Sequence, residues 1–121
     1  MRVLVIDDSR AMRMILKTTL LELGHEVVEA GDGQEGLDRL KSDGPFDIAL
    51  VDWNMPVKNG YEFVCAARGD SAFAAMKIVM VTTEVEMSQV AKVLEAGANE
   101  YVMKPFTPEI LKEKLEMLLA A

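Results

Sequence analysis

Short apolar runs alternate with amphipathic stretches along the whole chain. Five runs rich in Val and Ile are predicted to be strands: 2–6 (RVLVI), 26–30 (EVVEA), 46–51 (FDIALV), 77–83 (KIVMVTT) and 100–103 (EYVM). The third and fourth runs are almost continuously hydrophobic, which is typical of parallel strands covered on both faces. The pattern therefore predicts parallel strands between two layers of helices.

The segments between these runs have the spacing of helices with one apolar face. Leu16, Leu20 and Leu23 share a face in the first helical segment, and Leu111 and Leu115 do so in the last. Helix starts are marked by candidate N-caps and helix ends by candidate C-terminal glycines: Ser9, Asp32, Asn59, Thr83 and Thr107, then Gly24 and Gly97. Strand and helix alternate five times without a linker, which predicts one α/β domain over residues 1–121 with an open, doubly wound parallel sheet.

Composition and charge narrow the classes of function. The 121 residues carry a formal net charge of −7, which disfavours nucleic-acid binding because that needs clustered Lys and Arg. No apolar run approaches the ~20 residues of a membrane span, so we expect a cytoplasmic protein without membrane contact. Cys65 is the single cysteine, which excludes an intramolecular disulfide.

Charged and hydroxyl side chains stand where the predicted strands end. Asp7 and Asp8 follow the first strand, Asp52 the third, Thr82 closes the fourth, and Lys104 follows the fifth. In an open parallel sheet the carboxyl ends of the strands share one edge, where ligands bind. We therefore expect these five side chains to converge.

This cluster of charges favours a metal ion and phosphoryl chemistry. Two carboxylates about 4 Å apart repel by roughly 4 kcal/mol at an effective dielectric constant near 20, and Lys104 supplies one positive charge against three negative ones. Oxygen ligands of this kind suit Mg²⁺. A cation, an ammonium group, a hydroxyl and a carboxylate can together support phosphoryl transfer, with Asp52 as nucleophile.

Taken one at a time, the same residues have purely structural explanations. Asp7 and Asp8 could cap the first helix, Asp52 could be a loop residue, Thr82 an ordinary strand residue and Lys104 a solvated lysine. Their joint arrival at one edge of the sheet favours a functional site.

Four motifs resemble those of a known family. VIDDS (5–9), DWNMPVKNG (52–60), MVTTE (80–84) and YVMKPFT (101–107) are similar to the motifs of receiver domains of two-component response regulators, and among these to the single-domain chemotaxis regulators. The resemblance covers the whole chain. It implies a flavodoxin-like (βα)5 fold with strand order 2-1-3-4-5.

The resemblance also implies roles for the residues at the sheet edge. Asp52 would be the phosphoryl acceptor. Asp8, Asp52 and the backbone carbonyl of Asn54 would bind Mg²⁺ directly, and Asp7 largely through water. Lys104, expected to precede a cis peptide bond to Pro105, would pair with the phosphoryl group.

A switch and a partner surface follow from the same resemblance. Thr82 would move to bond a phosphoryl oxygen, and the ring of Tyr101 would turn inward behind it. The surface that responds would lie on the fourth helix, fifth strand and fifth helix and include Val90, Ala98, Tyr101, Met103 and Lys114.

The implied partners are a chemotaxis-type histidine kinase as phosphoryl donor and a flagellar motor switch protein or other output protein, with a phosphatase as an optional third. A monomer is sufficient for these roles. The chemotaxis subgroup is further matched by Trp53, Asn54 and Glu84. The chain departs from the family pattern at 57–59, where Asp commonly precedes the glycine, at Thr83, where many members have a smaller residue, and at 85–86.

Other functions are less well supported. A phosphate-sink receiver that does not bind the motor would have the same pocket, so the sequence leaves this alternative open. A small Mg²⁺-dependent phosphatase would need a separate general acid, and the chain has one histidine, His25, predicted at the opposite edge. A flavin-binding module would need a phosphate-binding loop after the first strand, where DDSR is acidic instead. We therefore expect a signalling phospho-acceptor rather than an enzyme.

Overall fold

The computed structural model describes residues 1–83 and 88–120. Five parallel strands form one sheet: β1 (Arg2–Ile6), β2 (Glu26–Ala30), β3 (Ile48–Asp52), β4 (Lys77–Thr82) and β5 (Glu100–Met103). Their order is β2-β1-β3-β4-β5, and all four pairings are parallel. The predicted flavodoxin-like fold and strand order are therefore confirmed.

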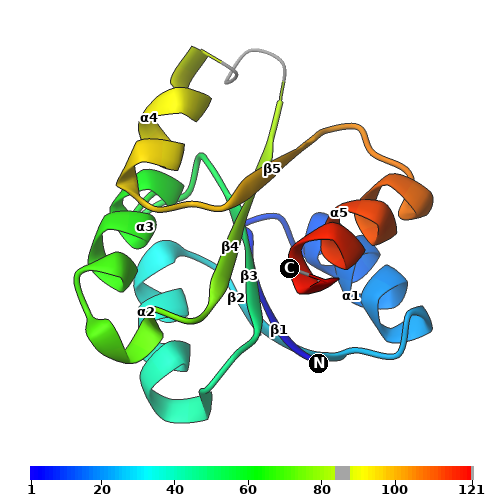
Figure 1. The fold of residues 1–121 in the computed structure, drawn as a ribbon, viewed down its shortest axis with the longest axis horizontal. Coiled ribbons are helices and arrows are strands. Elements are labelled where there is room, and N and C mark those ends of the chain that lie inside the picture. The colour runs from blue at the N-terminus through cyan, green and yellow to red at the C-terminus, as the bar shows by residue number, and fades with distance from the viewer. Residues whose placement is uncertain (84–87, 121) are drawn as a thin grey trace.

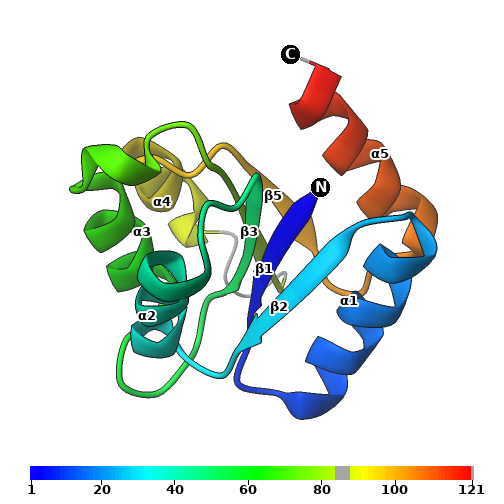
Figure 2. The same ribbon diagram turned by 90° about the horizontal axis from the view of Figure 1, so that it is seen from below.

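Helices cover both faces of this sheet. They are α1 (Arg10–Glu22), α2 (Gly33–Asp43), α3 (Gly60–Arg68), α4 (Val90–Ala96) and α5 (Pro108–Ala120), and a 3₁₀ turn, η1 (Ser71–Phe73), precedes β4. Figures 1 and 2 show α1 and α5 on one face and α2, α3 and α4 on the other. None of the helices in the described part of the chain combines the length and hydropathy needed to cross a membrane.

The strands divide the core into two clusters because successive side chains point to opposite faces. In β1, Val3 and Val5 pack toward α1 and α5, whereas Leu4 and Ile6 pack toward α2, α3 and α4. Every residue of β3 is buried, which explains why its first four residues, Ile48 to Val51, are all hydrophobic. Each fully buried Val or Leu side chain contributes roughly 1.5–3 kcal/mol to this core.

Four of the five predicted N-caps are confirmed by hydrogen bonds. Side-chain oxygens of Ser9, Asp32, Asn59 and Thr107 accept from the backbone N–H three residues later. Asn59 forms a complete capping box, because the Glu62 side chain also accepts from the Asn59 N–H. The box fixes the start of α3, eight residues after Asp52.

The described part of α4 begins at Val90 after Gln89, which makes no side-chain capping bond. The N-cap expected at Thr83 would bond within residues 84–87, so it stays a prediction. Glu84, Val85 and Glu86, which the sequence analysis also used, lie outside the described residues. The predicted end is correct, since Gly97 follows Ala96 with a φ of 122°.

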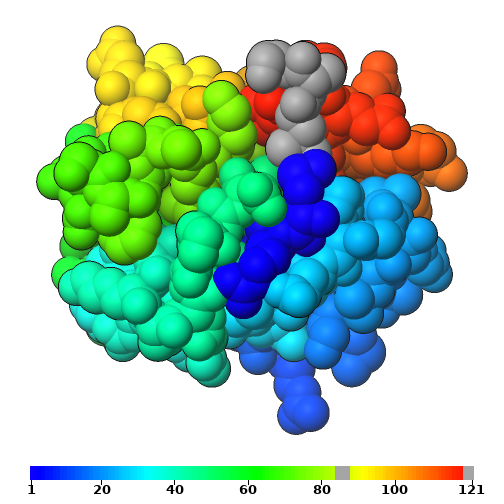
Figure 3. All heavy atoms as spheres, turned by 60° about the horizontal axis from the view of Figure 1, so that its bottom comes forward, coloured from blue at the N-terminus to red at the C-terminus, as the bar shows by residue number. Residues whose placement is uncertain are grey.

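Arg2 closes the end of the sheet where the strands begin, a role that the sequence did not predict. Its guanidinium bonds the backbone carbonyls of Asp43 and Pro45, pairs with Glu26, and lies 4.7 Å from the centroid of the Phe46 ring. Figure 3 shows this end of the molecule, with the N-terminal segment at the surface between the α1–β2 and α2–β3 segments. One residue thus ties the α2–β3 connection to the start of β2.

Gly60, the first residue of α3, lies very close to the backbone at the end of β3. Its N–H donates to the Trp53 carbonyl at 2.9 Å, and a Cβ there would lie 2.4 Å from the Asp52 carbonyl oxygen and 2.8 Å from Met80 Cε. Gly60→Ala should therefore lower the free energy of unfolding by about 2 kcal/mol or more, because backbone atoms must move. Urea denaturation measures this change.

Gly24→Ala is the matched control. Its Cβ would meet nothing within 4 Å, so only the φ of 88° opposes it, at about 1 kcal/mol. Equal destabilisation by the two substitutions would show that the close approach at Gly60 does not constrain the fold.

Candidate functional site

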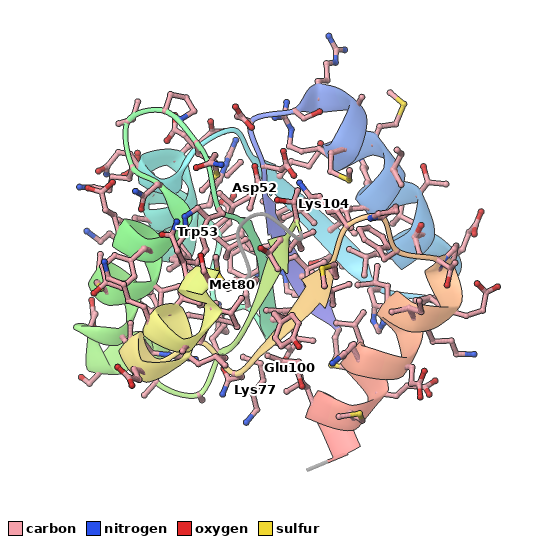
Figure 4. The ribbon with its side chains drawn as sticks, turned by 90° about the horizontal axis from the view of Figure 1, so that it is seen from above. Asp52, Trp53, Lys77, Met80, Glu100 and Lys104 are labelled. Carbon is pink, nitrogen blue, oxygen red and sulfur yellow. The ribbon has the colours of Figure 1, made fainter. Side chains whose placement is uncertain are left out.

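The ends of β1, β3 and β5 bring two carboxylates and an ammonium group into contact. Asp52 is the last residue of β3, paired in register with Val81 of β4, so its carboxylate is fixed by the sheet itself. Lys104 Nζ lies 3.1 Å from Asp52 Oδ1 and 3.5 Å from Asp7 Oδ2. Figure 4, seen from the side where the strands end, shows Asp52 and Lys104 next to each other, with Trp53 toward α3.

Asp8 completes an acidic cluster with Asp7 and Asp52. One carboxylate oxygen from each of the three lies within 4.8 Å of the others. Asp7 and Asp52 are buried, at 1% and 8% exposure, while Asp8 is exposed and leaves the cluster open to solvent. The predicted convergence of these residues is therefore confirmed, and their roles remain predictions.

The donor set fits a divalent cation. The buried Asp7 Oδ2 accepts no hydrogen bond, although Lys104 Nζ is near it, so it keeps a lone pair for another cationic group. Three carboxylates against one ammonium leave two uncompensated negative charges, which a hard divalent ion such as Mg²⁺ would neutralise. The cluster could therefore hold a metal.

Burial and charge shift the pKa values of the central pair. Burial, then the charge of Asp7, raises the pKa of the Asp52 carboxyl above its ordinary value, although Lys104 and a backbone hydrogen bond from Trp53 oppose this. Burial acts to lower the pKa of Lys104, but its hydrogen bond with Asp52 and its charge interactions with Asp52 and Asp7 outweigh this effect and raise the pKa. Lys104 is thus a permanent cation at neutral pH.

Arg13 holds the loop that carries Asp7. Its Nη1 donates to the Asp7 backbone carbonyl at 2.6 Å, and its Nε lies 3.4 Å from Glu29 Oε1 on β2. The Ser9 N–H also donates to Asp7 Oδ1 at 2.8 Å. Sequence reasoning missed Arg13, although a charged residue flanking the apolar stripe of α1 was a signal that could have found it.

Thr82 is fully buried at the end of β4, and its hydroxyl donates to the Thr83 carbonyl at 3.2 Å. On β5, Tyr101 is half-buried against the α3–α4 side of the core. Lys114 Nζ lies 5.3 Å from the centroid of its ring and 3.4 Å from Glu100 Oε1. A shift of Tyr101 would therefore alter contacts of both β5 and α5.

Two residues predicted to belong to the partner surface are buried in this conformation. Val90 and Ala98 are 6% and 7% exposed, and Ala98 belongs to the core cluster on the α2–α3–α4 side. Met103, by contrast, is 37% exposed and accompanies Tyr101 and Lys114 at the surface. The apolar character of Val90 and Ala98 reflects packing, which the sequence pattern could not separate from docking.

The segment after Asp52 turns at once from core to surface. Trp53 is buried and Asn54 is exposed. The role of the Asn54 carbonyl as a metal ligand remains a prediction. The expected cis peptide between Lys104 and Pro105 is present, and a second one joins Gly44 to Pro45.

Known proteins resemble this chain in sequence and in fold. Residues 3–116 match the response regulator receiver domain family. Chemotaxis protein CheY1 of Helicobacter pylori is 47% identical over 120 residues, covering 98% of this chain and 97% of that protein. A CheY homolog of Campylobacter jejuni is 48% identical, covering 98% and 92%. The structure of CheY4 of Vibrio cholerae superposes with a TM-score of 0.90 at 38% identity, covering 97% of each chain.

The chain therefore belongs to the response regulator receiver domain family, whose members act in two-component signalling. It is a receiver of the CheY type, because the similar chemotaxis proteins align over almost their full length.

Asp52→Asn should stabilise the protein in EDTA at neutral pH. A raised pKa means that the folded state opposes the charged carboxylate, so the cost is complete at high pH and disappears as the pH falls toward the ordinary value of 3.8. The stability difference between variant and wild type should shrink over the same range, as measured by urea denaturation. Asp38→Asn, an exposed control, should change stability by less than about 0.5 kcal/mol.

Arg13→Ala should weaken Mg²⁺ binding roughly fivefold, because it removes a charge-assisted hydrogen bond worth about 1 kcal/mol to the Asp7 backbone. Lys17→Ala is the matched control, since Lys17 Nζ also pairs with Glu29, at 3.5 Å. Calorimetric titration with MgCl₂ compares the two. Equal weakening by both variants would mean that Glu29, and not Asp7, transmits the effect.

Proposed function

We propose that this receiver accepts a phosphoryl group on Asp52 from the phosphohistidine of a chemotaxis-type histidine kinase. The observation that carries the proposal is the contact of Lys104 with both Asp52 and Asp7 at the open edge of the sheet. Mg²⁺ would be held directly by Asp8, Asp52 and the backbone carbonyl of Asn54, and by Asp7 largely through water. When bound, it would neutralise charge on the phosphoryl oxygens.

The transfer follows from the position of the acceptor. A lone pair of an Asp52 carboxylate oxygen attacks phosphorus; the new P–O bond gives an acyl phosphate as the P–N bond to histidine breaks. The electron pair of that bond stays on the imidazole nitrogen, which is then available for a proton. Lys104, 3.1 Å from Oδ1, is placed to pair with a phosphoryl oxygen and keeps its proton because its pKa is raised. The protein is thus an acceptor that assists its own modification, not an enzyme acting on others.

Phosphorylation would be reported through Thr82 and Tyr101. The Thr82 hydroxyl would stop donating to the Thr83 carbonyl and donate to a phosphoryl oxygen instead. One neutral hydrogen bond would be lost and a stronger, charge-assisted one gained. Tyr101, packed beside this strand end, would move inward and change its contact with Lys114. Two discrete arrangements of this kind can switch an affinity.

The responding surface would comprise Tyr101, Met103 and Lys114. Val90 and Ala98 could join it only in a conformation that uncovers them, because both are buried here. Similarity to the CheY chemotaxis proteins supports a flagellar motor switch protein as the output partner. We place this exchange of partners in the cytoplasm, with the receiver acting as a monomer.

Acetyl phosphate and MgCl₂ test the acceptor directly. Trp53, the single tryptophan, is buried beside Asp52, so its fluorescence should change saturably at each addition. Intact-mass spectrometry should show one added phosphoryl group on the wild type and none on Asp52→Asn. Bound Mg²⁺ at 100 times its Kd should also raise the free energy of unfolding by about 2.7 kcal/mol.

Equal phosphorylation of Asp52→Asn would refute the acceptor. Absence of a Mg²⁺ effect in both fluorescence and calorimetry would instead refute the metal site and leave the acidic cluster with a structural role.

A further inference from the structure

Val57, in the connection between β3 and α3, has a backbone conformation that suits its side chain poorly. Its φ is 67°, and among the described residues it is the one non-glycine position with a positive φ. The Lys58 N–H donates to the Pro56 carbonyl at 2.7 Å, so the chain reverses tightly around Val57. A β-branched residue in this region costs on the order of 1–3 kcal/mol.

Neighbouring backbone contacts impose this turn. The Gly33 N–H donates to the Lys58 carbonyl at 3.0 Å, and a Cβ on Gly33 would lie 2.5 Å from that oxygen. At the other end of the connection, the Gly60 N–H donates to the Trp53 carbonyl. The connection is therefore held at both α2 and the end of β3, and the Val57 side chain is not needed to shape it.

The Val57 side chain also contributes little to the core. It is 76% exposed, more than any other large hydrophobic residue in the described parts of the chain. Glycine or asparagine would adopt the same φ at lower cost and would expose less apolar surface. Because the exposed isopropyl group adds little to the stability of the fold, we look for its role in binding a partner.

The position of Val57 indicates which partner. Asp52 is 8% exposed and lies where the strands end. The connection 53–59 begins directly after it. Half-buried Met55 and exposed Pro56 continue the apolar surface toward Val57. A protein domain that presents a phosphohistidine is far larger than a small phosphodonor, so it contacts residues around Asp52 that the small donor need not touch.

We propose that Val57 is a docking contact for the phosphohistidine-bearing domain of the kinase. The inference rests on the proposed phosphorylation of Asp52. Because the turn is fixed before binding, the side chain is presented without further ordering cost, which favours recognition of a protein donor. Val57 thereby selects among donors and takes no part in the chemistry at Asp52.

Three substitutions separate apolar contact from backbone strain. Val57→Asn and Val57→Gly remove the apolar group and relieve the strain, whereas Val57→Leu keeps an apolar side chain without β-branching. Leu21→Asn, at an α1 position that is 51% exposed, is the control for loss of a surface apolar group elsewhere. The donors are acetyl phosphate and the ³²P-labelled phosphotransfer domain of a chemotaxis-type histidine kinase from the same organism.

We expect Val57→Asn and Val57→Gly to be at least as stable as wild type in urea and to accept phosphate from acetyl phosphate at the wild-type rate. Their kcat/KM with the phosphotransfer domain should fall at least fivefold, while Val57→Leu and Leu21→Asn stay within twofold. Unchanged transfer from the domain to Val57→Asn would overturn the docking role, as would an equal loss with both donors. Failure of the proposed function is distinct, because the wild type would then not react with acetyl phosphate.

Discussion

Repulsion between two buried carboxylates is the constraint on which the rest of this structure depends. Asp7 and Asp52 share one ammonium group, Lys104, which reaches them from the far side of β4. Since strand ends are separated by roughly 4.8 Å per strand, such contact requires β1, β3 and β5 to be held in one register. β3, which is buried throughout, and β4, which is buried from Ile78 on, supply that register through their packing on both faces.

The supports of the acidic cluster lie at several levels of the fold. Arg13 and Ser9 hold the loop of Asp7 through backbone and side-chain oxygens, and Gly60 lets α3 start directly against the Asp52 carbonyl. None of these three residues contributes a charge to the cluster itself. Preorganisation by such neighbours is what allows a small domain to keep like charges together at its surface.

Periodicity and strand ends sufficed to predict the fold and the convergence of Asp7, Asp8, Asp52 and Lys104, because each signal is local in sequence. What failed depends on three-dimensional context. Arg2 bonds backbone carbonyls 41 and 43 residues away in the sequence, and such contacts leave no local sequence pattern. Burial of Val90 and Ala98 likewise depends on packing between elements.

The order of the strands places the acidic cluster and the residues that would respond to it on successive strands of the sheet. Asp52 ends the central strand, which pairs with β1 through Val51 and with β4 through Asp52 itself, so the backbone there is held and a response to a change at Asp52 must arise in neighbours. Thr82 lies one strand away on β4, and Tyr101 two strands away on β5, which is the margin of the sheet. A change at Asp52 on β3 can therefore reach the edge strand β5 through β4 alone. The other edge strand, β2, lies on the opposite side of β3, so a change in its outward-facing residues would leave the path through β4 and β5 unaltered.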